Sequence, residues 1–215
     1  FGVCPFCGYV IGTPAEEATH LVPGTILHDR YLIGKALGYG GFGVTYIAWD
    51  SRLEQKVAIK EYLPSEFSTR MPGQSRVTIG SGDKSEQFHD GLDKFVDEAR
   101  RLAKFSNEAG IVRIFDSFKA NDTAYIVMEY LEGETLSDYL NENGVIDEDT
   151  AIDMLLPVMR SLETVHEAGL IHRDIAPDNI FITKTGEIKL IDFGAARYAT
   201  TKHSRSLTVI IKQGY

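Results

Sequence analysis

Cysteine is scarce in this sequence: only Cys4 and Cys7 occur among its 215 residues. Two cysteines cannot build a disulfide framework, and a chain otherwise free of thiols suits a reducing compartment, so we expect a cytoplasmic protein. The Cys-x-x-Cys spacing is half of a zinc ribbon, whose tetrahedral ion takes four nitrogen or sulfur ligands. Two interpretations stay open. Cys4 and Cys7 bind Zn²⁺ together with ligands further upstream in a longer protein, or they form an exposed turn.

The sequence also lacks an excess of positive charge and long hydrophobic runs. Lys and Arg total 22 against 31 Asp and Glu, a net charge of −9, which argues against a dedicated nucleic-acid or anionic-membrane binder. No apolar run approaches the roughly 18–20 residues of a membrane span, so none is predicted in this segment. The 43% hydrophobic and 25% charged residues are ordinary globular values and exclude general disorder. Because the sequence begins with Phe1 rather than Met, we expect it to be part of a longer protein.

Hydrophobic periodicity predicts strands followed by helices, with glycine- and proline-rich segments between them. Residues 1–24 show no clear period and are interpreted as a zinc-binding knuckle and linker. Apolar residues at helical spacing predict helices over 85–105 and 147–167, the second containing Pro157, which we expect to kink it. Glycines and prolines predict an irregular insertion over 64–84. The predicted strands cover 31–37, 44–49, 56–61, 111–118, 124–130, 180–182 and 188–191.

A glycine-rich loop joins the first two predicted strands, with Gly38, Gly40 and Gly43 in the pattern G-x-G-x-x-G. Glycines allow backbone N–H groups to approach phosphate oxygens without a clash from Cβ atoms. By itself the pattern fits a dinucleotide-binding fold equally well. In that fold the loop opens a helix, whereas here a β-branched strand follows, which disfavours the dinucleotide interpretation.

Further motifs follow in a fixed order: Val57-Ala-Ile-Lys60, Glu98 in the predicted helix, His172-Arg-Asp-Ile-Ala-Pro-Asp-Asn179 and Asp192-Phe-Gly194. Over about residues 30–215 this set resembles the eukaryotic-type protein kinase family. The Cys-Pro-x-Cys-Gly head and the Lys-Glu-Tyr-Leu-Pro stretch look most like bacterial Ser/Thr kinases that carry an N-terminal zinc ribbon. The resemblance implies an α+β fold. An antiparallel sheet and one regulatory helix would form the N-lobe, followed by a partial, mainly helical C-lobe.

The resemblance also implies how the chain is divided and which residues act on phosphate. The implied units are a half zinc ribbon and linker over 1–24, the N-lobe over 25–130 and the partial C-lobe over 131–215. Phosphoryl transfer depends on positioning and on neutralising phosphate charge. The implied roles are phosphate binding by Lys60, support of Lys60 by Glu98, proton acceptance by Asp174, and Mg²⁺ binding by Asn179 and Asp192.

The same resemblance implies an adenine pocket. Met128 would be the gatekeeper and Glu129 to Leu131 the hinge, while Ala58 and Phe181 would cover the two faces of the base. Thr45 stands where the family usually has Val. The complete set of residues implied to contact ATP is Leu37, Gly38, Gly40, Gly43, Thr45, Ala58, Lys60, Met128, Glu129, Leu131 and Phe181.

The sequence departs from the family pattern near the catalytic loop and at its end. Ala176 stands where Ser/Thr kinases usually carry a lysine, and Lys212 stands where they usually carry a threonine. We expect Lys212 to supply the positive charge that Ala176 lacks, as a catalytic residue. The family's distal helical bundle should follow Tyr215, so we expect this fragment to be inactive alone, or to dimerise through exposed apolar surface of the truncated C-lobe.

These patterns favour a Ser/Thr protein kinase that transfers the γ-phosphate of Mg-ATP to hydroxyl groups of a protein substrate. The alternative is a pseudokinase or regulatory scaffold that binds ATP without transferring phosphate, which Ala176 and the truncation favour. The enzyme is favoured by the presence of the four residues Lys60, Asp174, Asn179 and Asp192. A third possibility, phosphorylation of a small molecule by the same fold, is disfavoured by the Ser- and Thr-rich tail.

Overall fold

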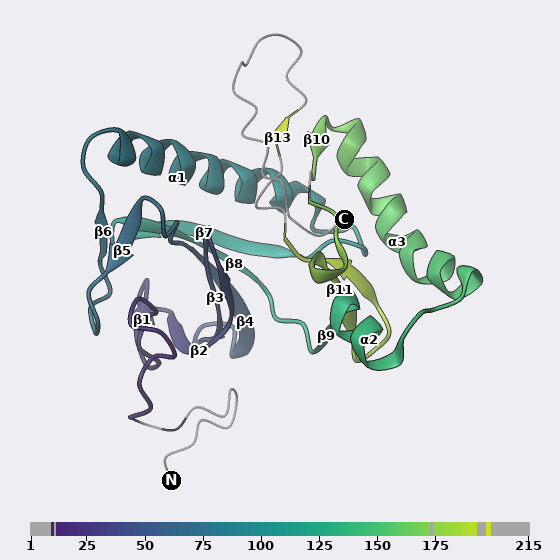
Figure 1. Ribbon diagram of the computed structural model, residues 1–215, viewed down its shortest axis with the longest axis horizontal. Coiled ribbons are helices and arrows are strands. Elements are labelled where there is room, and N and C mark those ends of the chain that lie inside the picture. Colours follow the sequence, from purple (N-terminus) through teal and green to yellow (C-terminus); the bar gives the residue numbers. More distant parts are fainter. Residues whose placement is uncertain (1–9, 11, 173, 193–196, 199–215) are drawn as a thin grey trace.

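The computed structural model describes residues 10, 12–172, 174–192 and 197–198, and has an α+β architecture (Figure 1). A six-stranded antiparallel sheet in the order β1-β2-β3-β4-β8-β7 forms the N-lobe. Its strands are β1 (Ile26–Leu27), β2 (Tyr31–Gly40), β3 (Gly43–Asp50), β4 (Gln55–Tyr62), β7 (Ile114–Ala120) and β8 (Thr123–Glu129). These strands confirm the ones predicted over 31–37, 44–49, 56–61 and 124–130, and part of the one over 111–118.

Helix α1 (Asp83–Leu102) packs against β7 and β8 along one side of the sheet (Figure 1). Its acidic first turn and basic last turn complement the helix dipole. The 3₁₀ turn η1 (Ala103–Phe105) continues α1, which confirms the helix predicted over 85–105. The buried residues of α1 recur at helical spacing and are Phe88, Leu92, Phe95, Val96, Ala99 and Leu102.

The irregular insertion predicted over 64–84 is wrong in part. Strands β5 (Ser68–Arg70) and β6 (Val77–Ile79) pair there as an antiparallel hairpin. Strand β6 consists of the β-branched residues Val77, Thr78 and Ile79, and Pro72 and Gly73 lie in the turn between the two strands. The prediction rested on the glycines and prolines of the whole segment. In the structure these residues lie in the turn of the hairpin or flank its two strands.

The C-lobe part of the chain contains two helices and a small sheet. Helix α2 (Leu136–Asn143) begins at a capping box formed by Thr135 and Asp138. Helix α3 (Glu148–Glu167) is capped by the Asp147 side chain, confirms the helix predicted over 147–167 and contains Pro157. The remaining elements are β9 (Gly133–Thr135), β10 (Leu170–Ile171), η2 (Pro177–Asn179), β11 (Ile180–Thr183), β12 (Ile188–Leu190) and β13 (Arg197–Tyr198). Strands β12, β11 and β9 form a three-stranded sheet.

The segment between η1 and β7 joins the two lobes at Gly110 and Leu190. Leu190 donates its N–H to the Gly110 carbonyl at 2.9 Å and accepts the Val112 N–H at 3.0 Å. A Cβ atom on Gly110 would lie 2.6 Å from the carbonyl oxygen of Pro157 in α3, so only glycine permits this approach. The strand that precedes Asp192 is therefore held against both the N-lobe connection and α3.

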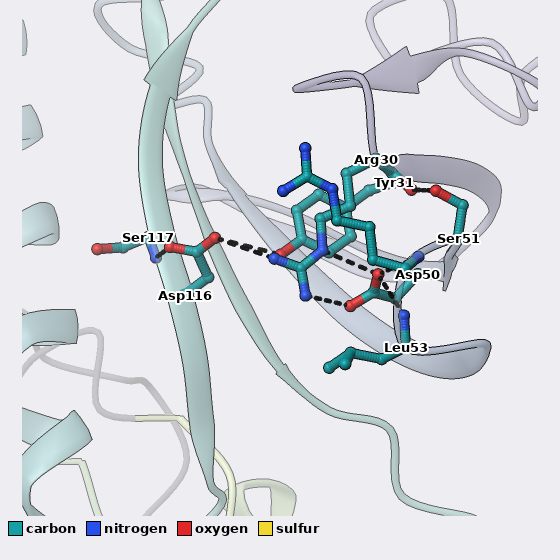
Figure 2. Close-up of polar contacts among 8 residues, drawn as sticks. Arg30, Tyr31, Asp50, Ser51, Leu53, Asp116 and Ser117 are labelled. Carbon is teal, nitrogen blue, oxygen red and sulfur yellow. Dashed lines mark hydrogen bonds and ion pairs between the residues drawn. The ribbon is translucent and has the colours of Figure 1, made fainter.

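Arg30 holds the far end of the N-lobe sheet together (Figure 2). Its guanidinium forms a two-pronged contact with Asp50, with Nε–Oδ1 at 2.8 Å and Nη2–Oδ2 at 2.6 Å. Asp116 on β7 lies 3.9 Å from Arg30 Nη1 and accepts the Tyr31 hydroxyl at 3.2 Å. Strands β2, β3 and β7 are thereby joined through side chains as well as through the sheet.

One face of α3 is apolar and exposed in the described part of the chain. Ile152, Leu156 and Met159 lie on it and are 51%, 37% and 60% exposed. A dimer through this surface stays a prediction. None of the described helices combines the length and the apolar character that a membrane span requires.

Candidate functional site: a glycine hairpin facing a paired lysine and two acidic residues

The glycine hairpin is formed by β2 and β3, with Gly40 paired to Gly43 at its tip. Cβ atoms on Gly38, Gly40 or Gly41 would meet nothing within 4 Å, so their backbone borders open space. Gly43 differs, because a Cβ there would lie 2.0 Å from the Glu61 carbonyl oxygen on β4. The third glycine of the motif is therefore required by close packing of two strands, and the others leave room beside the backbone for a ligand.

The register of β3 and β4 places predicted ATP contacts on one face of the sheet. Thr45 pairs with Lys60, and Ile47 pairs with Ala58. Cross-strand partners point to the same face and side chains alternate along a strand, so Thr45, Ala58 and Lys60 share one face. Ala58 also pairs with Met128, which is 7% exposed.

Lys60 is paired with Asp192 from the other lobe. Its Nζ lies 2.5 Å from Asp192 Oδ1, and the two side chains are 16% and 42% exposed. Residues 132 positions apart in the sequence are thereby brought into one ion pair. The predicted partner Glu98 lies half-buried on α1 and makes no ion pair within the described residues.

The surroundings of the Glu98 carboxyl group favour its protonated form. Burial is the main cause that raises its pKa to about 8; the positive charge of Lys60 opposes this shift, and the nearby Asp192 adds to it. At neutral pH the carboxyl group is therefore protonated in this arrangement. Lys60 is close enough to influence Glu98 electrostatically, but it forms its ion pair with Asp192.

Asp174 and Asn179 are brought together by the loop that leads into η2. Asn179 Nδ2 donates to the Asp174 carbonyl oxygen at 2.8 Å and to Asp174 Oδ2 at 3.1 Å. The His172 Nδ1 atom accepts the Asp174 N–H at 3.2 Å, and burial lowers the pKa of His172. A fully buried neutral imidazole thus fixes the backbone of Asp174, while Asn179 orients its carboxylate.

The donor set of this region fits a nucleotide with a hard divalent cation. Asp192 supplies a half-exposed carboxylate, and the amide oxygen of Asn179 accepts no hydrogen bond within the described part of the chain. Oxygen donors of this kind suit Mg²⁺, which keeps several waters and takes few protein ligands. Among the described residues, no group of three or more His, Cys, Asp or Glu side chains is arranged to hold a metal ion, so a dense all-protein metal cage is not found there.

The predicted hinge follows β8 and is anchored by its first residue. Glu129 Oε1 accepts the Arg113 N–H at 2.8 Å and lies 2.7 Å from Lys189 Nζ on β12. Leu131 is half-buried at the packed edge of the core. The other predicted contacts, Leu37 at the start of the glycine hairpin and Phe181 on β11, are 43% exposed and half-buried, respectively.

Three predicted site residues, Cys4, Cys7 and Lys212, lie outside the described residues. Ala176, the position that lacks the expected lysine, is 5% exposed and forms the N-cap of η2.

Among the ion pairs that sequence reasoning missed are Glu129–Lys189 and Glu61–Arg70. The Glu61–Arg70 pair has side chains that are 0% exposed on both sides. One signal was available for it, because Glu61 continues the alternation of the buried residues Val57 and Ile59. A carboxylate at such a position requires a charged partner, although the sequence alone does not say which.

The comparisons with known proteins agree with this geometry. The family model described as protein kinase domain matches residues 31–215. The chain is 37% identical over 174 residues to a probable serine/threonine-protein kinase of Clostridium acetobutylicum, covering 81% of this chain and 23% of that protein. It is 35% identical over 186 residues to the serine/threonine-protein kinase PknL of Mycobacterium tuberculosis, covering 86% and 42%. The chain thus spans less than half the length of these relatives.

A solved structure shows the same fold. The structure titled PpkA-294 apo form superposes with a TM-score of 0.75 at 34% sequence identity, covering 82% of this chain and 62% of that chain. The α+β fold predicted from the sequence, an antiparallel sheet with one helix followed by helices, is confirmed.

Proposed function

Because the chain belongs to the protein kinase family, we propose that it is the nucleotide-binding and catalytic-loop part of a Ser/Thr protein kinase that transfers the γ-phosphate of ATP to protein hydroxyl groups. The observation that carries the proposal is the meeting of Lys60 with Asp192 across the lobes, beside the open glycine hairpin. Asp174 and Asn179 are joined in the same lobe as Asp192. These are the charges and oxygen donors that phosphoryl transfer requires.

In this mechanism each residue acts on a defined part of the reaction. The backbone of Gly38, Gly40 and Gly41 lies against the phosphates, and the Lys60 ammonium binds their oxygens once it leaves Asp192. The Asp174 carboxylate, held by Asn179, accepts the proton of the substrate hydroxyl as the oxygen attacks the γ-phosphorus. Asp192 and Asn179 would hold Mg²⁺, which supplies neutralisation of the phosphate charge when bound.

The adenine site is proposed on the same face of the sheet. Ala58 on β4 and Thr45 on β3 would lie over the base, while Phe181 would approach from β11. Leu37 borders this site at the start of the glycine hairpin. The backbone from Glu129 to Leu131 would pair with the base beside Met128, and the Glu129 side chain is held away by Arg113 and Lys189.

The experiment measures transfer of radiolabel from ATP to a generic basic protein. It compares the wild type, as its gene encodes it, with the Asp174→Asn variant. We expect incorporation by the wild type and a loss of roughly 10²-fold or more in the variant, which keeps the contact with Asn179 but cannot accept the proton. Equal incorporation by both would contradict the assignment of Asp174. Calorimetric titration with Mg-ATP, run in parallel, measures nucleotide binding independently of transfer.

The second candidate function, an ATP-binding scaffold, is favoured by one observation. Ala176 is buried where Ser/Thr kinases usually present a lysine to the transferred phosphate. Binding of Mg-ATP without any transfer to protein would support the scaffold over the enzyme. Under the enzyme proposal, Lys212 supplies the missing charge.

Further proposals concern the rest of the protein and its surroundings. We propose a cytoplasmic location and a Zn²⁺ site that uses Cys4 and Cys7 with further ligands, supported by their spacing. Zinc released from the purified protein by acid, and its loss in Cys4→Ser, test this site against the exposed-turn interpretation.

We also propose dimerisation through the apolar face of α3. Analytical ultracentrifugation should show a dimer for the wild type and a shift to monomer for Met159→Glu.

A further inference from the structure

The face of the N-lobe sheet opposite Lys60 carries a buried polar cluster that the nucleotide site does not use. Side chains alternate along a strand, so Glu61 points away from the face that presents Lys60. Glu61 and Arg70 form an ion pair in which both side chains are 0% exposed. Arg70 comes from β5, so the inserted hairpin supplies the partner for the strand that carries Lys60.

Residues 19–21, upstream of the sheet, complete this cluster. Arg70 Nη1 donates to the Thr19 carbonyl oxygen and to Glu61 Oε2, both at 2.9 Å. The Tyr46 hydroxyl donates to Glu61 Oε2 at 3.0 Å and accepts the Leu21 N–H at 3.0 Å. Burial raises the pKa of Tyr46, so its hydroxyl keeps the proton that it donates to Glu61. Leu21 itself is 1% exposed.

His20 connects the same segment to the glycine hairpin. Its ring is 3% exposed and packs edge-on against Tyr39 of β2, with 5.0 Å between ring centroids. It also lies edge-on to Tyr46 of β3 at 6.2 Å. Residues 19–21 therefore contact the hairpin proposed to cover the phosphates and, through Tyr46 and Glu61, the strand that carries Lys60.

We propose that residues 19–21 are a positioning element of the nucleotide site, so that their docking on the outer face and nucleotide binding on the inner face strengthen each other. This inference rests on the proposed nucleotide-binding function. A buried ion pair is stable only when its remaining polar groups are satisfied. Here the Thr19 carbonyl oxygen accepts from Arg70, and the Leu21 N–H donates to the Tyr46 hydroxyl, which in turn donates to Glu61. When the segment leaves, Arg70 loses its contact with the Thr19 carbonyl oxygen, and the Tyr46 hydroxyl that binds Glu61 loses the Leu21 N–H. Coupling of this kind is reciprocal, so nucleotide must in turn hold the segment in place.

The test uses Tyr46→Phe with Tyr31→Phe as its matched control, in the protein as its gene encodes it. Both variants remove one hydroxyl from a tyrosine that is 0% exposed, but the Tyr31 hydroxyl binds Asp116 at the far end of the sheet (Figure 2). Calorimetry measures the Kd for Mg-ATP, and hydrogen exchange measures protection of residues 19–21 with and without Mg-ATP. We expect Tyr46→Phe to speed exchange of the segment and to weaken Mg-ATP binding by about fivefold or more, while Tyr31→Phe behaves as wild type.

A second variant, Leu21→Ala, loosens the segment without changing any residue of β3 or β4. It replaces Tyr46→Phe in the test if that variant does not fold. We expect it to raise the KM for ATP while the KM for the protein substrate stays constant, which a general loss of stability would not do. Faster exchange of the segment with an unchanged Kd for Mg-ATP overturns the inference and leaves the proposed function standing. Unchanged exchange in both variants, or equal weakening in Tyr31→Phe, also overturns it. A wild-type protein that binds no Mg-ATP overturns both proposals.

Discussion

Lys60 Nζ lies 2.5 Å from Asp192 Oδ1, while Glu98 on the neighbouring helix makes no ion pair within the described residues. A single ammonium group thus joins β4 to the segment that follows β12. The Glu98 carboxyl group is left half-buried and protonated at neutral pH. Nucleotide binding, as proposed, must draw the ammonium away from Asp192, so both acidic side chains change their surroundings in the same step.

Replacing Lys60 by methionine should abolish phosphate transfer and leave the fold intact. The variant removes the ammonium group that is proposed to bind the phosphates, and loss of one such group costs roughly 10²-fold or more in turnover. Radiolabel transfer measures the effect, and circular dichroism checks the fold. Lys119→Met, at an exposed ion pair with Asp93, is the control and should keep full turnover. Wild-type turnover in Lys60→Met would refute the assignment.

Stability should fall as pH rises, with Glu98 responsible for part of the decline. Burial raises the pKa of Glu98 to about 8 in the folded protein, whereas an unfolded glutamate has a pKa of about 4.3. The folded state therefore holds the extra proton. Its contribution to stability is complete below about pH 4.3 and is lost as the pH rises through about 8.

Urea unfolding at about pH 5, 7 and 9 tests this dependence. Glu98→Gln cannot ionise, so its midpoint should fall less across this range than that of the wild type. Glu86→Gln, on the exposed side of the same helix, is the control and should follow the wild-type profile. Parallel profiles for the wild type and Glu98→Gln would show that Glu98 does not titrate in this range.

Gly43→Ala should destabilise the N-lobe, whereas Gly41→Ala should not. A Cβ at Gly43 would lie 2.0 Å from the Glu61 carbonyl oxygen, which forces β3 and β4 apart, while a Cβ at Gly41 meets open space. Overpacking of this kind costs about 1–3 kcal/mol of unfolding free energy. Urea midpoints of the two variants measure the difference, and equal midpoints would contradict the close packing described here.

Loss of Glu129 should lower the unfolding free energy more than loss of its ion-pair partner Lys189. Glu129→Ala leaves the ammonium of Lys189, whose side chain is 10% exposed, without its carboxylate, and we expect a loss of about 3 kcal/mol in unfolding free energy. Lys189→Met should cost less, because Glu129 is 21% exposed and still accepts the Arg113 N–H. Equal losses in chemical denaturation would mean that burial of the ammonium does not dominate.

Lys212, which lies outside the described residues, should be needed for turnover if it replaces the lysine absent at Ala176. Lys212→Ala should lower turnover by roughly 10²-fold or more, since a developing metaphosphate needs positive charge nearby. Ala176→Lys combined with Lys212→Thr should recover part of the activity. Lys202→Ala, in the same tail, serves as the control. Unchanged turnover in Lys212→Ala would show that Lys212 does not replace the missing lysine.

Much of the candidate site follows from local sequence pattern. The glycine hairpin was predictable because Gly38 to Gly43 separate an apolar run from a β-branched one, and α1 because its apolar residues recur at helical spacing. The pairing of Asp174 with Asn179 connects positions close in the sequence. Short-range steric and hydrogen-bonding preferences decide such features, so the chain specifies them before any distant contact forms.

Tertiary structure alone decided which charges meet. Lys60 had acidic candidates at Glu98 and Asp192, and the contact with Asp192 depends on how the two lobes are held at Gly110 and Leu190. Period-2 alternation placed Glu61 on a buried face, but its partner Arg70 depends on the hairpin folding back over the sheet. The energy of a charge depends on burial and on neighbours from distant segments, and spacing along the chain does not encode these.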